Sequence, residues 1–206
     1  VSSTLSAMTG LKTIVLSMPI KQNESQHDLS LKHQDWLIKK FKNVEDHNVN
    51  RDKLFDSFSA TLEKLDNEHG FANTRARLRM ATLYQVAAAN KGIVVGTGNK
   101  VEDFGVGFYT KYGDGGVDIS PIADCNKTDV WELGKELGIL KEIIDAHPTD
   151  GLWDDGRTDE GQLGFKYQDL EDAMKNPNSP HRQEYEKIRK QNLHKMEPIP
   201  VCKIPS

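Results

Sequence analysis

The stretch NTRARLRMATLYQVAAANKGIVVGTGNKVED, residues 73–103, decides the fold of this chain. Its first part has the composition of a long helix that ends at Gly92, and we expect Asn73 to cap its start. The apolar run Ile93–Val95 follows and predicts a short buried strand. The glycines of the next three residues, GTG, predict a tight turn whose backbone can approach a bound anion. Helix, strand and glycine turn in this order are typical of a βαβ unit.

The segments before this stretch repeat the same alternation. After a helix that ends at Gly10, Thr13–Met18 is rich in β-branched residues, and Val44–Val49 is a candidate for a second strand. Both runs predict buried parallel strands, and apolar residues near helical spacing predict a helix between them. Residues 51–70 carry another helical stripe, for which we expect an end at Gly70. We therefore predict an α/β fold with a mainly parallel sheet and helices on both faces.

The C-terminal part predicts helices and loops without further strands. Residues 127–148 predict two short helices, and Ser179–His194 predicts a charged helix followed by an extended, proline-containing tail. Residues 149–165 are acidic and contain glycines, which predicts a loop that is either a lid or a plain surface excursion.

Composition restricts the class of protein. A chain of 206 residues predicts a single domain, and 27 Lys and Arg against 31 Asp and Glu give a formal net charge of −4. This charge disfavours nucleic acid as a partner. No apolar run has the length that a membrane span requires. The two cysteines lack zinc-site spacing, which predicts reduced thiols and a cytoplasmic protein.

Two charged segments are candidates for chemistry. In FYTKYGDGGVDISP, residues 108–121, charged residues stand among glycines, which is typical of a loop that binds a polar substrate. Glu102 follows the GTG turn at a distance where a carboxylate near phosphates would recruit Mg²⁺, although acids also favour the first turn of a helix without a ligand. The GTG turn alone leaves phosphate binding and a purely steric turn equally open.

Three arginines, Arg75, Arg77 and Arg79, stand close to the predicted start of a helix, where cations oppose the helix dipole. Their placement indicates an anionic ligand or acidic partners. Arg75 and Arg79 share one face and Arg77 points nearly opposite, so the three need not act together. For two of the three, the pattern predicts pairing with neighbouring acidic residues.

Taken together, the segments VVGTGNKVEDFGVGFYTKYGDGGVDISPI, NTRARLRMATLYQVA and HPTDGLWDDGRTDE and a late HK pair closely resemble ammonia-dependent NAD synthetase, over nearly the whole chain. This resemblance implies an N-type ATP pyrophosphatase with a Rossmann-like parallel sheet of the adenine nucleotide alpha hydrolase kind, acting as a homodimer. It implies a carbon–nitrogen ligase that adenylates the carboxylate of deamido-NAD with Mg-ATP, releases pyrophosphate, and lets ammonia displace AMP to form NAD.

The resemblance also assigns roles to individual residues. It implies ATP contacts at Thr97, Lys127 and Thr149, a magnesium ligand at Glu102, and a catalytic contribution from Lys127, Asp114 and Asp118. It implies deamido-NAD contacts at Arg77, Lys111, Asp118, His194 and Lys195. Asp114 falls in the loop where the family is thought to receive ammonia, and either Asp114 or Asp118 is a hypothesis for holding NH₄⁺ and removing its proton.

One family motif does not occur in the sequence. The pyrophosphate-binding loop SGGxDS is absent, and residues 1–10 look like the helix that follows it. We therefore expect residues 1–206 to form a single NAD synthetase domain whose first strand and pyrophosphate loop precede Val1. Two alternatives stay open: another amidating ATP pyrophosphatase, for example one similar to GMP synthetase, or an adenine-nucleotide-binding module without catalysis.

Overall fold

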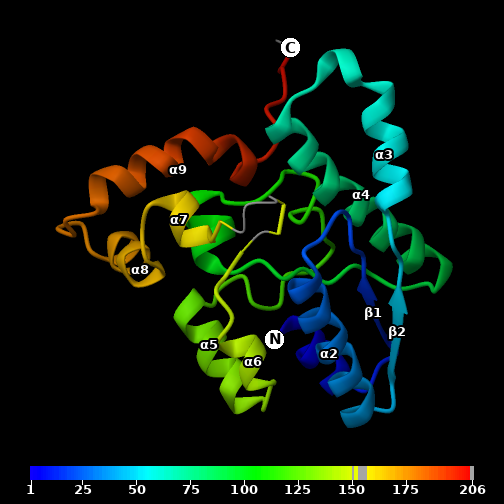
Figure 1. The fold of residues 1–206 in the computed structure, drawn as a ribbon. Coiled ribbons are helices and arrows are strands. Elements are labelled where there is room, and N and C mark those ends of the chain that lie inside the picture. Colours follow the sequence, from blue (N-terminus) through cyan, green and yellow to red (C-terminus); the bar gives the residue numbers. More distant parts are fainter. Residues whose placement is uncertain (150, 153–156, 205–206) are drawn as a thin grey trace.

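Two parallel strands form the regular part of the sheet. The computed structural model describes residues 1–149, 151–152 and 157–204. Strand β1 (Thr13–Ser17) pairs in parallel with β2 (Val44–Asn48), with Thr13 opposite Val44 at one end of the register. The helix α2 (Glu24–Lys40) connects the two strands and packs against both, as Figure 1 shows. Both predicted strands and the crossover helix are confirmed.

The strand predicted at Ile93–Val95 is reduced to a single parallel bridge, between Val95 and Ile119. The amide of Gly96 donates to the carbonyl of Ile119 at 2.7 Å, and the amide of Asp118 donates to the carbonyl of Val94 at 2.9 Å. This pairing joins the GTG turn to the glycine-rich segment 108–121. Two segments that carry predicted site residues, among them Thr97 and Asp114, therefore start from neighbouring strand ends.

The helices on β1 and β2 bury a small apolar core. Ala7 of α1 (Ser2–Met8), Leu37 of α2 and Val44 of β2 pack together, with Val15, Trp36 and Phe41 around them. Helix α1 ends before Gly10, which has a φ of +77° that favours glycine. The predicted helix end at Gly10 is confirmed.

The helical segment between residues 51 and 92 has other boundaries than the sequence predicts. Helix α3 (Asp52–Thr61) is followed by a 3₁₀ turn (Glu63–Leu65), and α4 (Glu68–Ala89) already contains Gly70. The predicted helix end at Gly70 is wrong, because the side chain of Asn67 caps α4 by accepting from the amide of Gly70 at 2.7 Å.

The predicted cap at Asn73 is wrong for the same reason. Its side chain donates to the carbonyl of His69 one turn earlier at 3.0 Å, and its carbonyl oxygen accepts from the hydroxyl of Thr110 at 2.6 Å. Asn73 therefore ties α4 to the glycine-rich segment instead of beginning a helix.

The C-terminal part is helical, and the helices surround a second core. Val101 and Val106 of a π-helix labelled η2 (Lys100–Val106) pack against Tyr167, Leu170, Ala173 and Tyr185. These last four residues come from α8 (Tyr167–Lys175) and α9 (Arg182–Met196), which lie on the same side of the molecule in Figure 1. Helix α8 has no counterpart in the sequence-based expectations, whereas α9 confirms the predicted charged helix.

Two short helices, α5 (Lys127–Glu136) and α6 (Lys141–Ile144), occur as predicted. The segment predicted as a loop contains a further helix, α7 (Asp159–Leu163), whose first turn is capped by the hydroxyl of Thr158. Residues 150 and 153–156 of that segment lie outside the described residues. Within the described ranges, every helix is too short or too polar to cross a bilayer.

A buried carboxylate fixes the start of α5. Glu171 of α8 is 8% exposed, and its two oxygens accept from the amide of Thr128 at 3.0 Å and from the hydroxyl of Thr128 at 2.7 Å. The carboxylate thus satisfies an amide that the helix itself leaves unpaired, and its charge suits the positive end of the helix dipole. Glu171 therefore positions Lys127, the first residue of α5.

We expect Glu171→Ala to lower the free energy of unfolding by about 1 to 3 kcal/mol, because the amide and hydroxyl of Thr128 lose a buried, charged acceptor. Urea denaturation measures this change. Asp172→Ala, which truncates an exposed carboxylate on the same helix, is the control and should change stability little. Equal stability of the parent and Glu171→Ala would contradict a capping role for Glu171.

Candidate functional site

Two cavities meet at Thr97, which lines both of them. The first has a volume of about 750 Å³ and lies between α2 and α5. The second has a volume of about 780 Å³ and lies between α4, the glycine-rich segment and the end of α9. Thr97 follows the bridge between Val95 and Ile119, so the cavities open at the carboxyl end of the parallel pairing, where α/β folds usually bind ligands.

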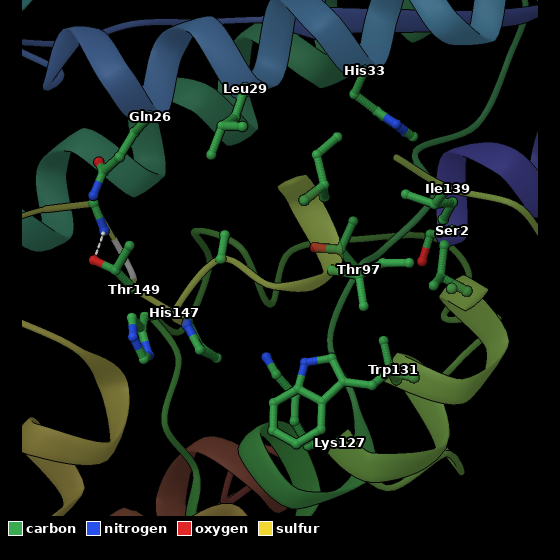
Figure 2. A pocket seen from close by; sticks show the side chains of 18 of the residues that line it. Ser2, Gln26, Leu29, His33, Thr97, Lys127, Trp131, Ile139, His147 and Thr149 are labelled. Carbon is green, nitrogen blue, oxygen red and sulfur yellow. Dashed lines mark hydrogen bonds between the residues drawn. The ribbon is translucent and has the colours of Figure 1, made fainter. Parts of the chain in front are cut away.

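The first cavity contains all three residues for which the resemblance implies ATP contacts. Figure 2 shows Thr97 between the side chains that α2 contributes and Lys127 and Trp131 of α5, with Thr149 at the far side. The hydroxyl of Thr149 donates to the carbonyl of Arg157 at 3.2 Å and accepts from the amide of Gly151 at 3.2 Å. The fold thus brings Thr97, Lys127 and Thr149 together, although 52 residues separate the first from the last.

Glu102 lies behind Lys127 and is its ion-pair partner. The Nζ of Lys127 is 2.8 Å from Oε1 of Glu102, and each of the two side chains is 16% exposed. The hydroxyl of Tyr167 donates to the same oxygen at 2.5 Å, and the side-chain Nδ2 of Asn99 donates to Oε2 at 2.6 Å. The ammonium of Lys127 also lies 4.9 Å from the centre of the Tyr167 ring. Three segments of the chain therefore hold one carboxylate.

The predicted magnesium ligand can be tested against this donor set. Within the described residues, no group of three or more His, Cys, Asp or Glu side chains could hold a metal ion. Oε1 of Glu102 already accepts two hydrogen bonds, whereas Oε2 accepts one. Glu102 therefore fits Mg²⁺ only as a single carboxylate ligand through Oε2, with the remaining ligands from phosphate oxygens and water, which is a common arrangement for this ion.

The second cavity gathers most residues for which the resemblance implies deamido-NAD contacts. Its lining includes Arg77, Lys111, Asp114, His194 and Lys195. The described lining residues include four Lys and Arg side chains and a single acid, Asp114, a difference of three positive charges if His is neutral. The cavity therefore favours an anionic ligand, although the whole chain has a net charge of −4.

Backbone carbonyls hold the cations of this cavity in place. The Nζ of Lys195 donates to the carbonyls of Gly107 at 2.8 Å and Tyr109 at 3.0 Å, and Tyr109 donates its hydroxyl to the carbonyl of Lys195 at 2.5 Å. Lys111 donates to the carbonyl of His194 at 2.5 Å. The end of α9 is thus tied to the glycine-rich segment, and this contact brings His194 and Lys195 to the cavity.

Asp118 is placed differently from the other predicted residues. It does not line either cavity, and its oxygens accept from the amide of Val94 at 2.7 Å and from the hydroxyl of Tyr84 at 3.1 Å. These bonds fix the start of the bridge between Val95 and Ile119. Within this chain, Asp118 therefore has a structural contact, and its role towards a substrate stays a prediction.

Two acids of the site have raised pKa values. Burial raises the pKa of Asp114, while the hydrogen bond that its Oδ1 accepts from the amide of Thr110 at 3.0 Å and the charge of Lys195 oppose the change. Burial, followed by the charges of Asp114 and Glu102, raises the pKa of Asp103 from 3.8 to about 7. No pattern in the sequence indicates this pKa, because the carboxylate of Asp103 is buried only in the folded chain.

Gly98 is the residue that makes room for Asp103. A Cβ atom at Gly98 would lie 1.8 Å from Oδ2 of Asp103, so no other residue fits there without moving the carboxylate. The second glycine of the GTG turn therefore serves close packing, which was one of the two readings that the sequence left open.

A family model described as NAD synthase matches residues 3–204. The chain belongs to the NAD synthase family. It is 36% identical over 187 residues to an NH₃-dependent NAD⁺ synthetase of Finegoldia magna, covering 90% of this chain and 75% of that protein. It is 43% identical over 126 residues to an enzyme of the same name from Thermoplasma volcanium, covering 61% of this chain and 51% of that protein. The matched part thus spans about half to three quarters of these relatives.

Solved structures show the same fold. NMN synthetase from Francisella tularensis matches with a TM-score of 0.89 and 31% identity, covering 98% of this chain and 83% of that one. NH₃-dependent NAD synthetase from Campylobacter jejuni matches with a TM-score of 0.71 and 22% identity, covering 98% and 86%. These structures confirm the predicted α/β, Rossmann-like fold, and the family membership confirms the resemblance seen in the sequence.

The raised pKa of Asp103 predicts a pH-dependent stability cost. Because the folded pKa exceeds the unfolded value, the folded protein binds the proton more tightly, and stability is lost as pH rises from about 4 through about 7. Asp103→Asn should therefore gain stability over the parent progressively across this window, reaching on the order of 2 to 4 kcal/mol above pH 7. Urea denaturation at several pH values, without divalent ions, measures the difference. A difference that does not change with pH would contradict this prediction.

Proposed function

We propose that this protein amidates deamido-NAD to NAD, with ATP and ammonia as co-substrates and AMP and pyrophosphate as further products. The observation that carries the proposal is the meeting of two cavities at Thr97, one with the predicted ATP contacts and one with a cationic lining. Membership in the NAD synthase family and the names of the curated relatives support it.

The reaction needs two steps, because a carboxylate is a poor acyl donor and ammonia does not displace its oxygen directly. In the first step, a carboxylate oxygen of the nicotinate ring attacks the α-phosphorus of ATP, and pyrophosphate leaves. In the second step, ammonia attacks the carboxyl carbon of the adenylate, and AMP leaves with the oxygen that joined the two groups. The product is NAD, in which the carboxylate has become a carboxamide. Both steps require the α-phosphate and the nicotinate carboxylate to meet, which suits cavities that share a wall.

Lys127 is the residue that we place at the phosphates of ATP. Its ammonium lines the first cavity and is held by Glu102 and the ring of Tyr167. A preorganised cation stabilises charge that develops on phosphate oxygens without reorganising during the reaction. Mg²⁺ bound at Oε2 of Glu102 would add Lewis-acid neutralisation of the phosphates. Thr97 and Thr149 supply hydroxyls at the same cavity.

Asp114 is the candidate for handling ammonia. It is the single acid among the described lining residues of the second cavity, and its raised pKa brings it closer to the range in which a carboxylate accepts a proton. Only neutral ammonia is nucleophilic, so a carboxylate that attracts NH₄⁺ and accepts its proton would assist the second step. Asp118, which contacts Val94 and Tyr84, has weaker support for this role.

A second candidate function is the amidation of nicotinate mononucleotide to NMN. The TM-score of 0.89 to an NMN synthetase, against 0.71 to an NH₃-dependent NAD synthetase, favours it. Both reactions use the same chemistry and differ in whether an AMP group extends the substrate. The four cations of the second cavity suit the phosphate of either nucleotide.

Two broader expectations complete the proposal. We propose a homodimer, which is supported by the apolar side chains that α3 exposes, Leu54 at 45% and Phe58 at 39%. We also propose a reducing compartment such as the cytoplasm, since Cys125 and Cys202 are both free thiols.

Incubation of the protein with deamido-NAD, Mg-ATP and ammonium should yield NAD and AMP in equal amounts. Lys127→Ala should lower kcat by about 10²- to 10³-fold, because it removes a charge that stabilises the transition state. Lys135→Ala, which removes an exposed lysine of the same helix, should keep the parent activity. Formation of ADP in place of AMP would rule out adenylation.

Competition between the two nicotinate nucleotides decides which is the substrate. If the dinucleotide is the substrate, kcat/KM for deamido-NAD should exceed that for nicotinate mononucleotide by at least about tenfold, because an additional phosphate and adenosine contribute binding energy. The measurement is the ratio of NAD to NMN formed from an equimolar mixture. A mixture converted mainly to NMN would replace the first candidate function with the second.

A further inference from the structure

Arg79 is the least expected side chain of the second cavity. The sequence pattern predicts that two of the three arginines Arg75, Arg77 and Arg79 pair with acidic residues, yet Arg79 binds two neutral oxygens. Its Nε donates to the carbonyl of Met18 at 3.0 Å, and its Nη2 donates to Oε1 of Gln22 at 3.0 Å. Among the residues that the structure describes, no carboxylate lies within ion-pair distance of its guanidinium.

The guanidinium keeps free donors at the cavity. Arginine carries five N–H groups, and the two bonds to Met18 and Gln22 use two of them, which leaves three without an acceptor in the described chain. The side chain is partly buried, and burial lowers its pKa, with the charge of Arg75 acting in the same direction and that of Asp114 against it. An arginine nevertheless stays charged, and a partly buried charge without a carboxylate in direct contact is costly.

Arg79 also stands at the border of the two cavities. It lines the second cavity together with Met18, which follows β1, and with Thr97. Gln22, its other partner, lines the first cavity and donates to Gln26 there at 2.5 Å. The bond between Arg79 and Gln22 therefore joins the walls of the two cavities close to the residue that both share.

We propose that Arg79 binds an anionic group of a nucleotide substrate where the two cavities meet, with Met18 and Gln22 fixing the orientation of its guanidinium. This inference rests on the proposed function for the identity of the substrates. The group is a pair of anionic oxygens, as a phosphate or a carboxylate presents, because the planar fork of arginine matches that geometry. Its source is either ATP or deamido-NAD.

Fixing the guanidinium in advance makes such a contact effective. Two hydrogen bonds from separate segments restrict the side chain, so less conformational entropy is lost when the anion binds. A purely structural arginine would tie α4 to the end of β1 and would leave ligand affinity unchanged. The two roles differ in an observable way, because only the first one changes the dissociation constant of a ligand for protein that is fully folded.

The test measures binding of each ligand separately by isothermal titration calorimetry, with the non-hydrolysable imido analogue of ATP alone and with deamido-NAD alone. Arg79→Gln should weaken at least one of the two by about 10- to 100-fold, because a charge-assisted contact is lost. Weaker binding of the ATP analogue assigns the anionic group to ATP, and weaker binding of deamido-NAD assigns it to deamido-NAD. Lys53→Gln, which removes one exposed positive charge from α3, is the control and should bind both ligands like the parent.

Arg79→Lys keeps the charge but loses the planar guanidinium, so it should weaken binding of the same ligand by about 3- to 10-fold. It replaces Arg79→Gln in the test if that variant does not fold. Thermal unfolding and circular dichroism establish that each variant is folded. Parent affinity for both ligands in a folded Arg79→Lys or Arg79→Gln variant would overturn the inference. If the parent protein binds neither ligand, the proposed function fails. If the parent and the folded variants bind both ligands equally well, only the inference about Arg79 fails.

Discussion

The site depends on how the carboxylate of Glu102 is satisfied. A carboxylate with 16% of its side chain exposed is stable only if its oxygens accept hydrogen bonds or face an opposite charge, and Glu102 has both. Lys127, Tyr167 and Asn99 donate to it from α5, from α8 and from the residue that precedes the π-helix. One largely buried carboxylate thus holds three segments together, and its ion pair places the ammonium of Lys127 at the first cavity.

The helices around Glu102 are arranged by the same principle. Glu171 caps α5 and thereby fixes the residue next to Lys127, while the phenol of Tyr167 lies in the apolar core that joins η2, α8 and α9. Burial and the neighbouring carboxylates raise the pKa of Tyr167, so its hydroxyl remains a donor. Apolar packing and hydrogen bonds therefore position this part of the site together, and neither kind of contact alone would do so.

The charge at the second cavity differs from the charge of the whole chain. The chain is acidic overall, whereas the described lining of the second cavity has an excess of three positive charges. Backbone carbonyls hold two of its cations, Lys111 and Lys195, and these carbonyls orient the ammonium groups without neutralising their charge. A polyanionic nucleotide fits such a lining better than a neutral metabolite.

Much of the fold could be predicted from the sequence, and the errors have identifiable causes. Strand β1 was found because its β-branched run carries the signal within a few residues, and β2 was placed from the alternation of helix and strand. The helix boundaries near Gly70 were missed, because the side chain of Asn67 offers a cap that outweighs the tendency of glycine to end a helix. Helix α7 was missed because its polar composition resembles that of a loop.

The sequence by itself determined the α/β class, the family and some of the residues that line the two cavities, since these depend on local patterns and on motifs of fixed spacing. Tertiary structure decided three further matters. It turned Asp118 towards Val94 and Tyr84, it raised the pKa of Asp103 by burial beside other acids, and it gave Arg79 neutral partners in place of acids. Burial, the distance between charges and the choice of hydrogen-bond partner are set by segments far apart in the chain, and local sequence does not contain them.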